Sequence, residues 1–491
     1  MSVVNVNPNN VVAINQLRLG VQIGHNMIRT FGLNQNYQKW ASDFCCKLIR
    51  FFDYQVNFNY PTGGPHHICQ WNEATQTGVF DWASVDNVVR AIFSVGAEPL
   101  IVLGMYWGLD LQSSDPRGYV PPGMSVDPIT QIPRPVTWAK YCAAWVQHFK
   151  DVGLPVRFYE IVNEIHVETV ERANNYMLVV NATVQAMKSI NPNVSISQDR
   201  ICMGGGGEGN PLLDYWLTHN GVDLDSINYH QYNCGTIDPT NPYYYDDPTI
   251  FNNTERDWEW QPNALLAKAA QTKWFNARNK KLPIFNTECN LNSAWEGGTD
   301  RRQQLMTGAV WLAITLRQEI LQEVSYHIYF TLAGSYVYET QHSSKPNDGL
   351  GFGFVNSDDG KPYVPYHVYK FIGNNLNLGD TIVESSTNSD SLRVLAWKNR
   401  SNLNIMLVNK THGPMSVQLT GVSGSFSLLK VDESIPSPIP DPNVDRSPIT
   451  ATVDAAQPLQ LNGYTVAFLQ QPLNNLPLFL LLALGALILW G

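Results

Sequence analysis

The sequence predicts an α/β protein: a (β/α)8 barrel, or TIM barrel, followed by a β-sandwich and a hydrophobic C-terminal tail. Three observations indicate this. Short apolar runs alternate with helical patterns over residues 1–376, strand-like alternation of apolar and polar residues fills 377–472, and the segment 473–491 is strongly apolar. The chain has 491 residues, a length that suits one large barrel with one smaller domain.

The barrel prediction rests on eight apolar, β-branched runs separated by helical patterns such as Trp82–Ser94 and Val136–Lys150. No Gly-x-Gly-x-x-Gly motif follows the first run, so a closed barrel is favoured over an open doubly wound sheet. The candidate strands are Leu19–His25, Lys47–Asp53, Glu98–Gly104, Val156–Val162, Val194–Gln198, Asp225–His230, Pro283–Thr287 and Val324–Phe330.

The helical periodicity stops after Gly379, and short alternating runs lie between Gly, Asn and Ser turns. This pattern is typical of a β-sandwich. The runs that predict it are Ser391–Trp397, Leu403–Asn409, Met415–Leu419 and Gly463–Leu469.

The last residues, Leu476–Gly491, contain no charge. They are slightly fewer than the roughly 20 residues that span a bilayer. We expect this tail to tether the protein to a membrane, which would make it a cell-surface or extracellular protein, although the N-terminus shows no signal peptide. A hydrophobic signal that is removed by processing and a buried or amphipathic tail stay open as alternatives.

The charge balance excludes one class of partner. Only 15% of residues are charged, and 32 Lys and Arg against 42 Asp and Glu give a net charge of −10, so no nucleic-acid partner is expected. Aromatic residues make up 11%, and aromatic faces together with Asn and Gln amides suit a neutral, hydroxyl-rich ligand such as a saccharide. The oligomeric state does not follow from the sequence.

Two carboxylates lie where a barrel places its working residues, at the C-terminal ends of strands. Glu164 follows the fourth candidate strand and Glu288 follows the seventh. Three βα units separate them, so they face each other across the mouth of the barrel. Paired carboxylates across a polar cleft suit cleavage of a glycosidic bond, and a separation of about 5–5.5 Å would indicate a retaining, covalent mechanism.

These segments, taken in order, resemble the retaining glycoside hydrolases of clan A. The resemblance covers roughly residues 17–472 and is closest to the family of β-xylosidases and α-L-iduronidases, which combines a barrel with a β-sandwich. It is carried by Val79–Asp86 (VFDWASVD), Gly96–Ile101 (GAEPLI), Tyr159–Glu164 (YEIVNE), Asp225–Tyr232 (DSINYHQY) and Thr287–Asn290 (TECN).

The resemblance implies roles for individual residues. Glu164 would be the general acid/base and Glu288 the nucleophile. Asn163 would hold the sugar hydroxyl next to the reacting carbon, where a hydrogen bond can strengthen in the transition state. Arg50 would lie beside Glu288, where a fixed positive charge keeps a carboxylate ionised. Either Tyr232 or His230 would hydrogen-bond Glu288 or the sugar.

The chain also departs from the pattern. Clan members often carry Trp before Asn-Glu and Pro after it, where this sequence has Val162 and Ile165. Their eighth strand commonly ends in a Trp that floors the sugar subsite, and here either His327 or Tyr329 would take that place. Further aromatic platforms for sugar rings are predicted in loops at Trp107 and Trp295.

We therefore expect a retaining O-glycosyl hydrolase that cleaves a neutral β-linked glycan, such as β-glucan or β-xylan, by double displacement. No cofactor or metal ion is expected. The alternative is a surface-anchored barrel that binds carbohydrate but has lost turnover. The sequence leaves the sugar, the linkage and endo or exo action open.

Overall fold

The computed structural model describes residues 1–23, 31–32, 34–53, 68–105, 120–165, 167, 169–202, 211–256, 262–294, 300–334, 352–356, 360–436 and 446–473. The chain divides into two compact units. One contains residues 16–374 with 435–446, and the other contains residues 1–15, 375–434 and the described residues from 447 onward.

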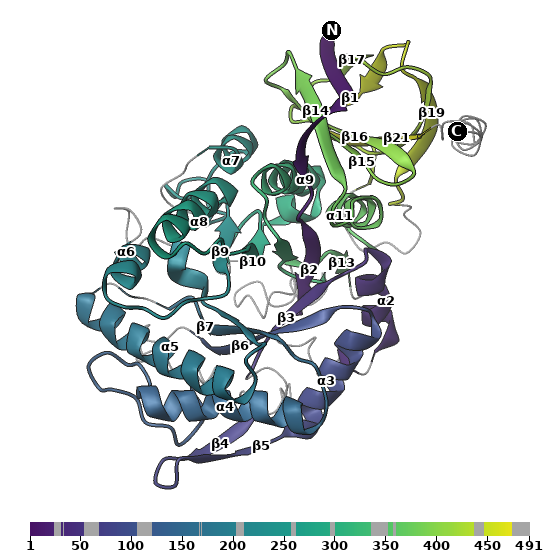
Figure 1. Ribbon diagram of the computed structural model, residues 1–491. Coiled ribbons are helices and arrows are strands. Elements are labelled where there is room, and N and C mark those ends of the chain that lie inside the picture. Colours follow the sequence, from purple (N-terminus) through teal and green to yellow (C-terminus); the bar gives the residue numbers. More distant parts are fainter. Residues whose placement is uncertain are drawn as a thin grey trace, which may run out of the picture. The chain divides into compact units, whose positions relative to one another are not determined.

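The first unit is built on eight parallel strands (Figure 1), which confirms the predicted barrel. In chain order they are β2 (Arg18–Gln22), β3 (Leu48–Phe52), β6 (Glu98–Met105), β7 (Phe158–Asn163), β8 (Ser195–Ser197), β9 (Ile227–Tyr232), β10 (Ile284–Asn290) and β11 (Tyr326–Tyr329). They pair in the order β8-β7-β6-β3-β2-β11-β10-β9. The ring closes where the backbone N–H of Asp225 donates to the carbonyl of Ile196 at 3.0 Å.

Helices between these strands are α2 (Gln35–Asp43), α3 (Trp82–Ser94), α4 (Pro135–Asp151), α5 (Val170–Ile190), α6 (Pro211–Thr218), α7 (Asp247–Thr254), α8 (Ala264–Arg278) and α9 (Met306–Leu321), and α11 (Val364–Asn375) follows β11. Local chemistry sets several of their starts. The side chain of Asp81 caps α3 by accepting the N–H of Ser84, and Pro135 occupies the first turn of α4, where its missing N–H leaves no bond unmade.

Smaller elements complete this unit. A hairpin pairs β4 (Cys69–Asn72) with β5 (Thr77–Phe80), and β12 (Ala333–Gly334) pairs with β13 (Val355–Asn356). The short 3-10 helix η1 (Asp199–Cys202) follows β8, and a second one, η2 (Arg301–Gln304), directly precedes α9. The first of them places Asp199 at the C-terminal end of the barrel strands.

Apolar side chains fill the lower part of the barrel interior. The cluster contains Leu48, Leu100, Phe285, Tyr326 and Ile328, all at most 3% exposed. Side chains alternate between the two faces of a strand, so the residue two positions further along faces the same interior one layer higher. Arg50 follows Leu48 in this way, and the polar layer of the barrel therefore rests on a packed apolar floor.

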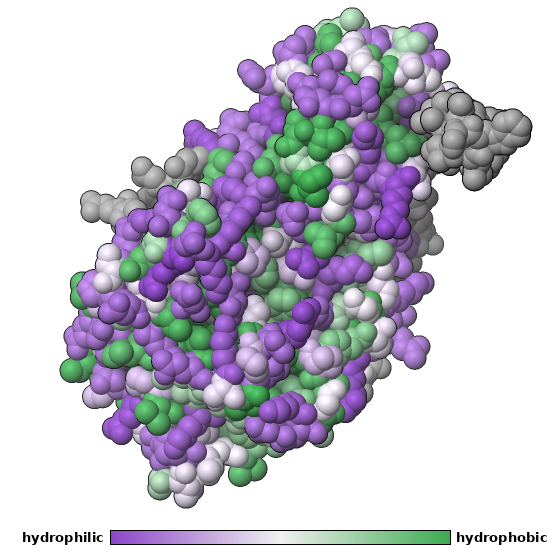
Figure 2. Space-filling model, viewed as in Figure 1, coloured by the Kyte–Doolittle hydropathy of each residue, from purple (hydrophilic) through white to green (hydrophobic). Residues whose placement is uncertain are grey.

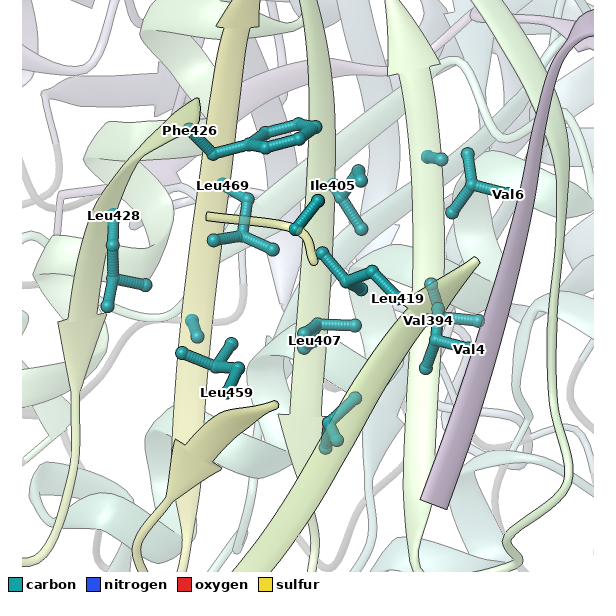
Figure 3. Close-up of a cluster of buried hydrophobic side chains, with 14 of the residues drawn as sticks. Val4, Val6, Val394, Ile405, Leu407, Leu419, Phe426, Leu428, Leu459 and Leu469 are labelled. Carbon is teal, nitrogen blue, oxygen red and sulfur yellow. The ribbon is translucent and has the colours of Figure 1, made fainter. Parts of the chain in front are cut away.

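The second unit is one mostly antiparallel sheet of nine strands. They are β1 (Ser2–Ile14), β14 (Thr381–Thr387), β15 (Leu392–Lys398), β16 (Asn402–Asn409), β17 (Met415–Thr420), β18 (Ser425–Val431), β19 (Ile449–Asp454), β20 (Leu459–Leu461) and β21 (Thr465–Pro472). Alternate residues of these strands, such as Ile405 and Leu407, face a shared core (Figure 3). Strands from both ends of the sheet contribute to this core, as expected for the predicted sandwich.

The N-terminal residues correct the predicted domain division of 1–376 and 377–472. Strand β1 pairs antiparallel with β14 and parallel with β17, so residues 1–15 belong to the sandwich and not to the barrel. Val4 and Val6 are fully buried in the sandwich core. The sequence does not reveal this because the pairing joins segments almost 400 residues apart in the chain, whereas periodicity reports only local structure.

The predicted tail, 473–491, lies beyond the described residues except for Leu473. Among the helices that the structure describes, none combines the length and apolar character needed to cross a membrane. On the face shown in Figure 2, hydrophilic and apolar residues are interspersed. The membrane tether and the cell-surface or extracellular location stay predictions of the sequence.

The place of β1 in the sandwich core can be tested with two substitutions on the same strand. Val6 is fully buried and Val12 is 52% exposed. We expect Val6→Asp to lower the free energy of unfolding by about 3 kcal/mol or more, because a carboxylate would be desolvated in an apolar core, and Val12→Asp to change it by less than about 0.5 kcal/mol. Urea unfolding followed by circular dichroism measures both. Equal losses would contradict the assignment.

Candidate active site

Arg50 stands at the centre of a buried polar cluster at the C-terminal end of the barrel strands. Its side chain is fully buried, and the residue lies in the middle of β3. Nε donates to Glu160 Oε2 at 3.0 Å, Nη1 donates to Glu288 Oε2 and Gln22 Oε1 at 2.6 Å each, and Nη2 donates to Asn163 Oδ1 at 2.6 Å. One guanidinium therefore links strands β2, β3, β7 and β10 and fixes the relative positions of their polar side chains.

Glu288 receives hydrogen bonds on both carboxylate oxygens. Arg50 donates to Oε2, and the hydroxyl of Tyr232, from the end of β9, donates to Oε1 at 2.6 Å. Burial and the nearby charge of Glu288 raise the pKa of Tyr232 well above its ordinary value, so the phenol keeps its proton and serves as a donor. A carboxylate held by a cation and a phenol is stabilised as the anion, which is the form a nucleophile requires.

Glu164 lies in a different environment. Its carboxylate contacts His230 Nδ1 through Oε1 at 2.9 Å, and its side chain is 21% exposed against 9% for Glu288. Its backbone N–H donates to Asp199 Oδ2 at 2.5 Å. Arg50 donates a hydrogen bond to Glu288. Among the described contacts of Arg50, none is with Glu164. The two glutamates thus meet different partners.

The backbone that carries Glu164 is strained. Val162 has φ of 57° and Glu164 has φ of 49°, so two residues on either side of Asn163 adopt the left-handed conformation. This conformation is unfavourable for a β-branched residue such as Val162. Strain of this kind concentrates at functional sites, where surrounding contacts hold it in place. Here it turns the chain at the end of β7 so that Asn163 meets Arg50 and Glu164 meets His230.

The two carboxylates come close together in the mouth of the barrel. An oxygen of Glu164, an oxygen of Glu288 and a ring nitrogen of His230 all lie within 4.8 Å of one another. Inverting glycosidases need a wider gap, about 6.5–9.5 Å, because a water molecule must fit between carboxylate and sugar. The described oxygens of the two carboxylates lie closer together than this range.

The imidazole of His230 lies between the carboxylates of Glu164 and Asp199. It is fully buried, and its Nε2 lies 3.4 Å from Arg50 Nη2 and 3.7 Å from Asp199 Oδ2, while Nδ1 faces Glu164. Burial opposes the charged form of the imidazole, but the negative charges of Glu288, Glu164 and Asp199 outweigh it and raise the pKa of His230. The ring is therefore placed to exchange a proton with Glu164.

Two sets of described residues bring donor atoms of the kind that bind metal ions within 4.8 Å of one another. They are Glu160, Asp199 and His230, and Glu164, His230 and Glu288. In both sets the negative charge already faces the guanidinium of Arg50, which bonds Glu160 and Glu288 directly. A second cation at this place would be repelled by Arg50.

Of the predicted aromatic residues, Tyr329 does not join this cluster. Tyr329 is 1% exposed and stacks on Phe354 with ring centroids 3.5 Å apart, and its hydroxyl lies 3.4 Å from Asn290 Oδ1. Its ring is thus part of the barrel wall. Trp107 and Trp295 lie outside the described residues.

The aromatic residue beside Tyr232 is instead Phe330, which follows β11 and packs with Tyr232 and Phe352. The other candidate at this strand, His327, is bonded to Glu319 at 2.7 Å behind the barrel wall. Sequence analysis missed Phe330 because the register of a short strand decides which of three neighbouring aromatic rings faces inward. Its signal was the run Tyr326–Phe330, which holds an aromatic ring at four of five positions counting the imidazole.

Sequence analysis also missed Gln22, Glu160 and Asp199. Glu160 sits inside an otherwise apolar strand and is fully buried, and Thr287 donates to its Oε1 at 3.3 Å. A charged residue on an interior strand position is a signal of a paired or functional group. Gln22 and Asp199 each lie at or just after the end of a barrel strand, the position that identified Glu164 and Glu288.

Comparison with solved structures places this geometry in a known architecture. An α-L-arabinofuranosidase from Thermotoga maritima matches with a TM-score of 0.63 and 15% identity, over 96% of this chain and 100% of that chain. A monomeric β-xylosidase from Caulobacter crescentus gives the same values. The chain has the fold of the clan A glycoside hydrolases. A GH39 enzyme from Xanthomonas axonopodis pv. citri agrees, with a TM-score of 0.62 and 15% identity, over 96% of this chain and 97% of that chain.

The likeness is confined to structure. No protein-family profile matches the sequence, and no curated protein is similar to it in sequence. The fold that the motif resemblance implied is thereby confirmed from coordinates, while the roles of individual residues depend on the geometry described above.

The raised pKa of His230 has a consequence for stability that can be measured. The folded protein binds this proton more tightly than the unfolded chain, so the stabilisation is complete below the ordinary pKa of 6.5 and is lost as pH rises through the folded-state value. We expect the difference in unfolding free energy between wild type and His230→Gln to be largest below pH 6.5 and to shrink above it.

Urea unfolding at a series of pH values measures this difference. A difference for His230→Gln that grows with pH would contradict the raised pKa.

Proposed function

We propose that the protein is a retaining glycoside hydrolase in which Glu288 is the nucleophile and Glu164 the general acid/base. The observation that carries the proposal is the pair of unlike environments less than 5 Å apart. Glu288 is held as an anion by Arg50 and Tyr232, whereas Glu164 contacts an imidazole and is more exposed. Double displacement needs this division of labour.

The geometry supports a sequence of two steps. In the first, Glu288 attacks the anomeric carbon while Glu164 donates its proton to the departing glycosidic oxygen, which forms a glycosyl ester and releases an alcohol. In the second, Glu164 takes a proton from water, and the resulting hydroxide equivalent displaces Glu288 and restores both residues. His230, in contact with Glu164 Oε1, is placed to orient this carboxylate in both steps.

Asn163 and Tyr232 are proposed to position the sugar. Asn163 Oδ1 accepts a hydrogen bond from Arg50, which fixes the amide and directs its NH2 group away from the guanidinium. That group can donate to the hydroxyl beside the reacting carbon.

A neutral β-linked glycan, such as β-glucan or β-xylan, is the substrate class we propose. The support is the low charge of the chain, its aromatic content, and the names of structures with the same fold, which include β-xylosidases and a bifunctional glucanase-xylanase at a TM-score of 0.56. α-L-Arabinofuranosidases share the fold as well, so arabinosides belong in any substrate panel.

Hydrolysis by the nucleophile variant is the direct test. We expect purified wild type to release the aglycone from at least one member of a panel of aryl glycosides and polysaccharides, and Glu288→Gln to show no detectable turnover because an amide cannot attack carbon. Glu171→Gln, which makes the same chemical change on the exposed first turn of α5, is the matched control and should keep wild-type rates. Equal hydrolysis by wild type and Glu288→Gln would reject the proposal.

The acid/base role predicts a dependence on the leaving group. We expect Glu164→Gln to lose about 10²–10⁴-fold in kcat/KM on substrates with a poor leaving group, because these require a proton on the departing oxygen. Activated aryl glycosides need little protonation, so the loss in kcat/KM on them should be much smaller. Uniform losses across leaving groups, measured by steady-state kinetics, would contradict this role.

The alternative of a carbohydrate-binding barrel without turnover makes the opposite prediction. It requires glycan binding by wild type and Glu288→Gln alike, with no hydrolysis of any panel member. Isothermal titration with the same oligosaccharides detects that outcome. The complete set of partners around Glu288 argues for turnover, because binding alone does not require a desolvated carboxylate held as an anion.

A further inference from the structure

The strand that carries Glu288 contains an irregularity just before it. On the β9 side, Asn286 pairs with Tyr229 and Glu288 pairs with the next residue, His230, so two steps on β10 match one step on β9. On the β11 side, Asn286 pairs with His327 and Cys289 pairs with Tyr329, so three steps match two. The pairing of β10 with β9 and its pairing with β11 therefore both show one extra residue in β10, which is a β-bulge.

The bulge changes which way Glu288 faces. Phe285 belongs to the apolar cluster inside the barrel, and Thr287 reaches Glu160 in the interior. In a regular strand the next interior residue would be 289, and Glu288 would share the outer face with Asn286. Instead Thr287 and Glu288 are consecutive interior residues. The nucleophile meets Arg50 only because the strand carries this extra residue.

A buried hydrogen-bond network covers the outer face of the bulge. Glu319, near the end of helix α9, accepts from Asn286 Nδ2 at 2.7 Å and from the Tyr229 hydroxyl at 3.0 Å, both on Oε1. Its Oε2 contacts His327 Nδ1 at 2.7 Å. Glu319 thus bonds one residue on each of three adjacent strands, β9, β10 and β11.

The network reaches past the bulge to its far side. His327 Nε2 lies 3.2 Å from the Sγ of Cys289, the residue after Glu288. Burial, together with the charges of Glu319 and Glu288, raises the pKa of Cys289 well above its ordinary value, so the group is a neutral thiol. Since Nδ1 faces a carboxylate, Nε2 can accept a hydrogen bond from the thiol. The contacts run from Asn286 through Glu319 and His327 to Cys289.

Asn286 and Cys289 are the outer residues on either side of the inward pair Thr287 and Glu288. We propose that Glu319 and His327 form a bracket that holds the bulge of β10 and thereby aims Glu288 at the cleft, so that both are positioning residues for the reaction. The inference rests on the proposed function for its catalytic meaning. It explains why Glu319 and His327 are both fully buried, since a buried carboxylate beside an imidazole gives little net stability compared with apolar packing.

Two donors to one oxygen provide a matched pair of variants. Asn286→Leu and Tyr229→Phe each remove one hydrogen bond to Glu319 Oε1, the first from the bulged strand and the second from its regular neighbour. We expect Asn286→Leu to lower kcat on an aryl glycoside by about 10²-fold with KM little changed, because a nucleophile misplaced by about 1 Å loses that much. Tyr229→Phe should keep kcat close to the wild-type value.

A reciprocal exchange guards against simple misfolding. Asn286→Asp alone sets two carboxylates against each other, whereas Asn286→Asp combined with Glu319→Gln restores an amide and a carboxylate in reversed order. We expect the double variant to recover most of the kcat that Asn286→Asp loses. Recovery of the unfolding midpoint without recovery of kcat would show a structural role only and would overturn the proposal.

Crystal structures of wild type, Asn286→Leu and Tyr229→Phe give a readout that does not depend on turnover. We expect the bond of 2.6 Å between Glu288 Oε2 and Arg50 Nη1 to be lost in Asn286→Leu and kept in Tyr229→Phe. If wild type hydrolyses a substrate and Asn286→Leu matches it in kcat, the bracket is wrong and the proposed function stands. If wild type hydrolyses nothing, the proposed function fails, and an unmoved Glu288 in Asn286→Leu would overturn the bracket as well.

Discussion

A buried guanidinium is the constraint on which the site depends. Burial opposes the charge of Arg50, but Glu160, Glu288 and Asp199 outweigh it and raise the pKa of Arg50 above its ordinary value. A fully buried cation of this kind is tolerated only with close, well-oriented partners. The hydrogen bonds that satisfy Arg50 are the same bonds that hold the side chains of Glu288 and Asn163. The contacts that stabilise the buried cation therefore also fix the positions of these two side chains.

The two glutamates differ in the partners that contact their carboxylates. Glu288 lies against Arg50 and Tyr232 and is stabilised as an anion. Glu164, at the strained end of β7, contacts His230 through its carboxylate and Asp199 through its backbone N–H. A cation bonded to one carboxylate and an imidazole beside the other thus give two chemically identical side chains different surroundings, and the proposed difference in roles rests on this.

Local sequence signals predicted much of this molecule. The eight barrel strands follow from their apolar runs, and Glu164 and Glu288 follow from carboxylates at predicted strand ends, because parallel strands in a barrel bring those ends together. Arg50 was predicted only from the family resemblance. The pairing of β1 with β14 was not predictable, since it joins distant segments. The place of Phe330 beside Tyr232 and the inward turn of Glu288 depend on register and on a bulge, which shift by single residues and leave no trace in periodicity.

The most direct test of the account is the identity of the residue that becomes covalently attached to sugar. A 2-deoxy-2-fluoro glycoside with an activated leaving group slows both steps but lets the first proceed, so the glycosyl ester accumulates and can be located by peptide mass spectrometry. The account predicts one label per chain, on Glu288. A label on another residue, or continued turnover of an ordinary substrate with no label formed, would contradict the assignment of Glu288 as the nucleophile held by Arg50.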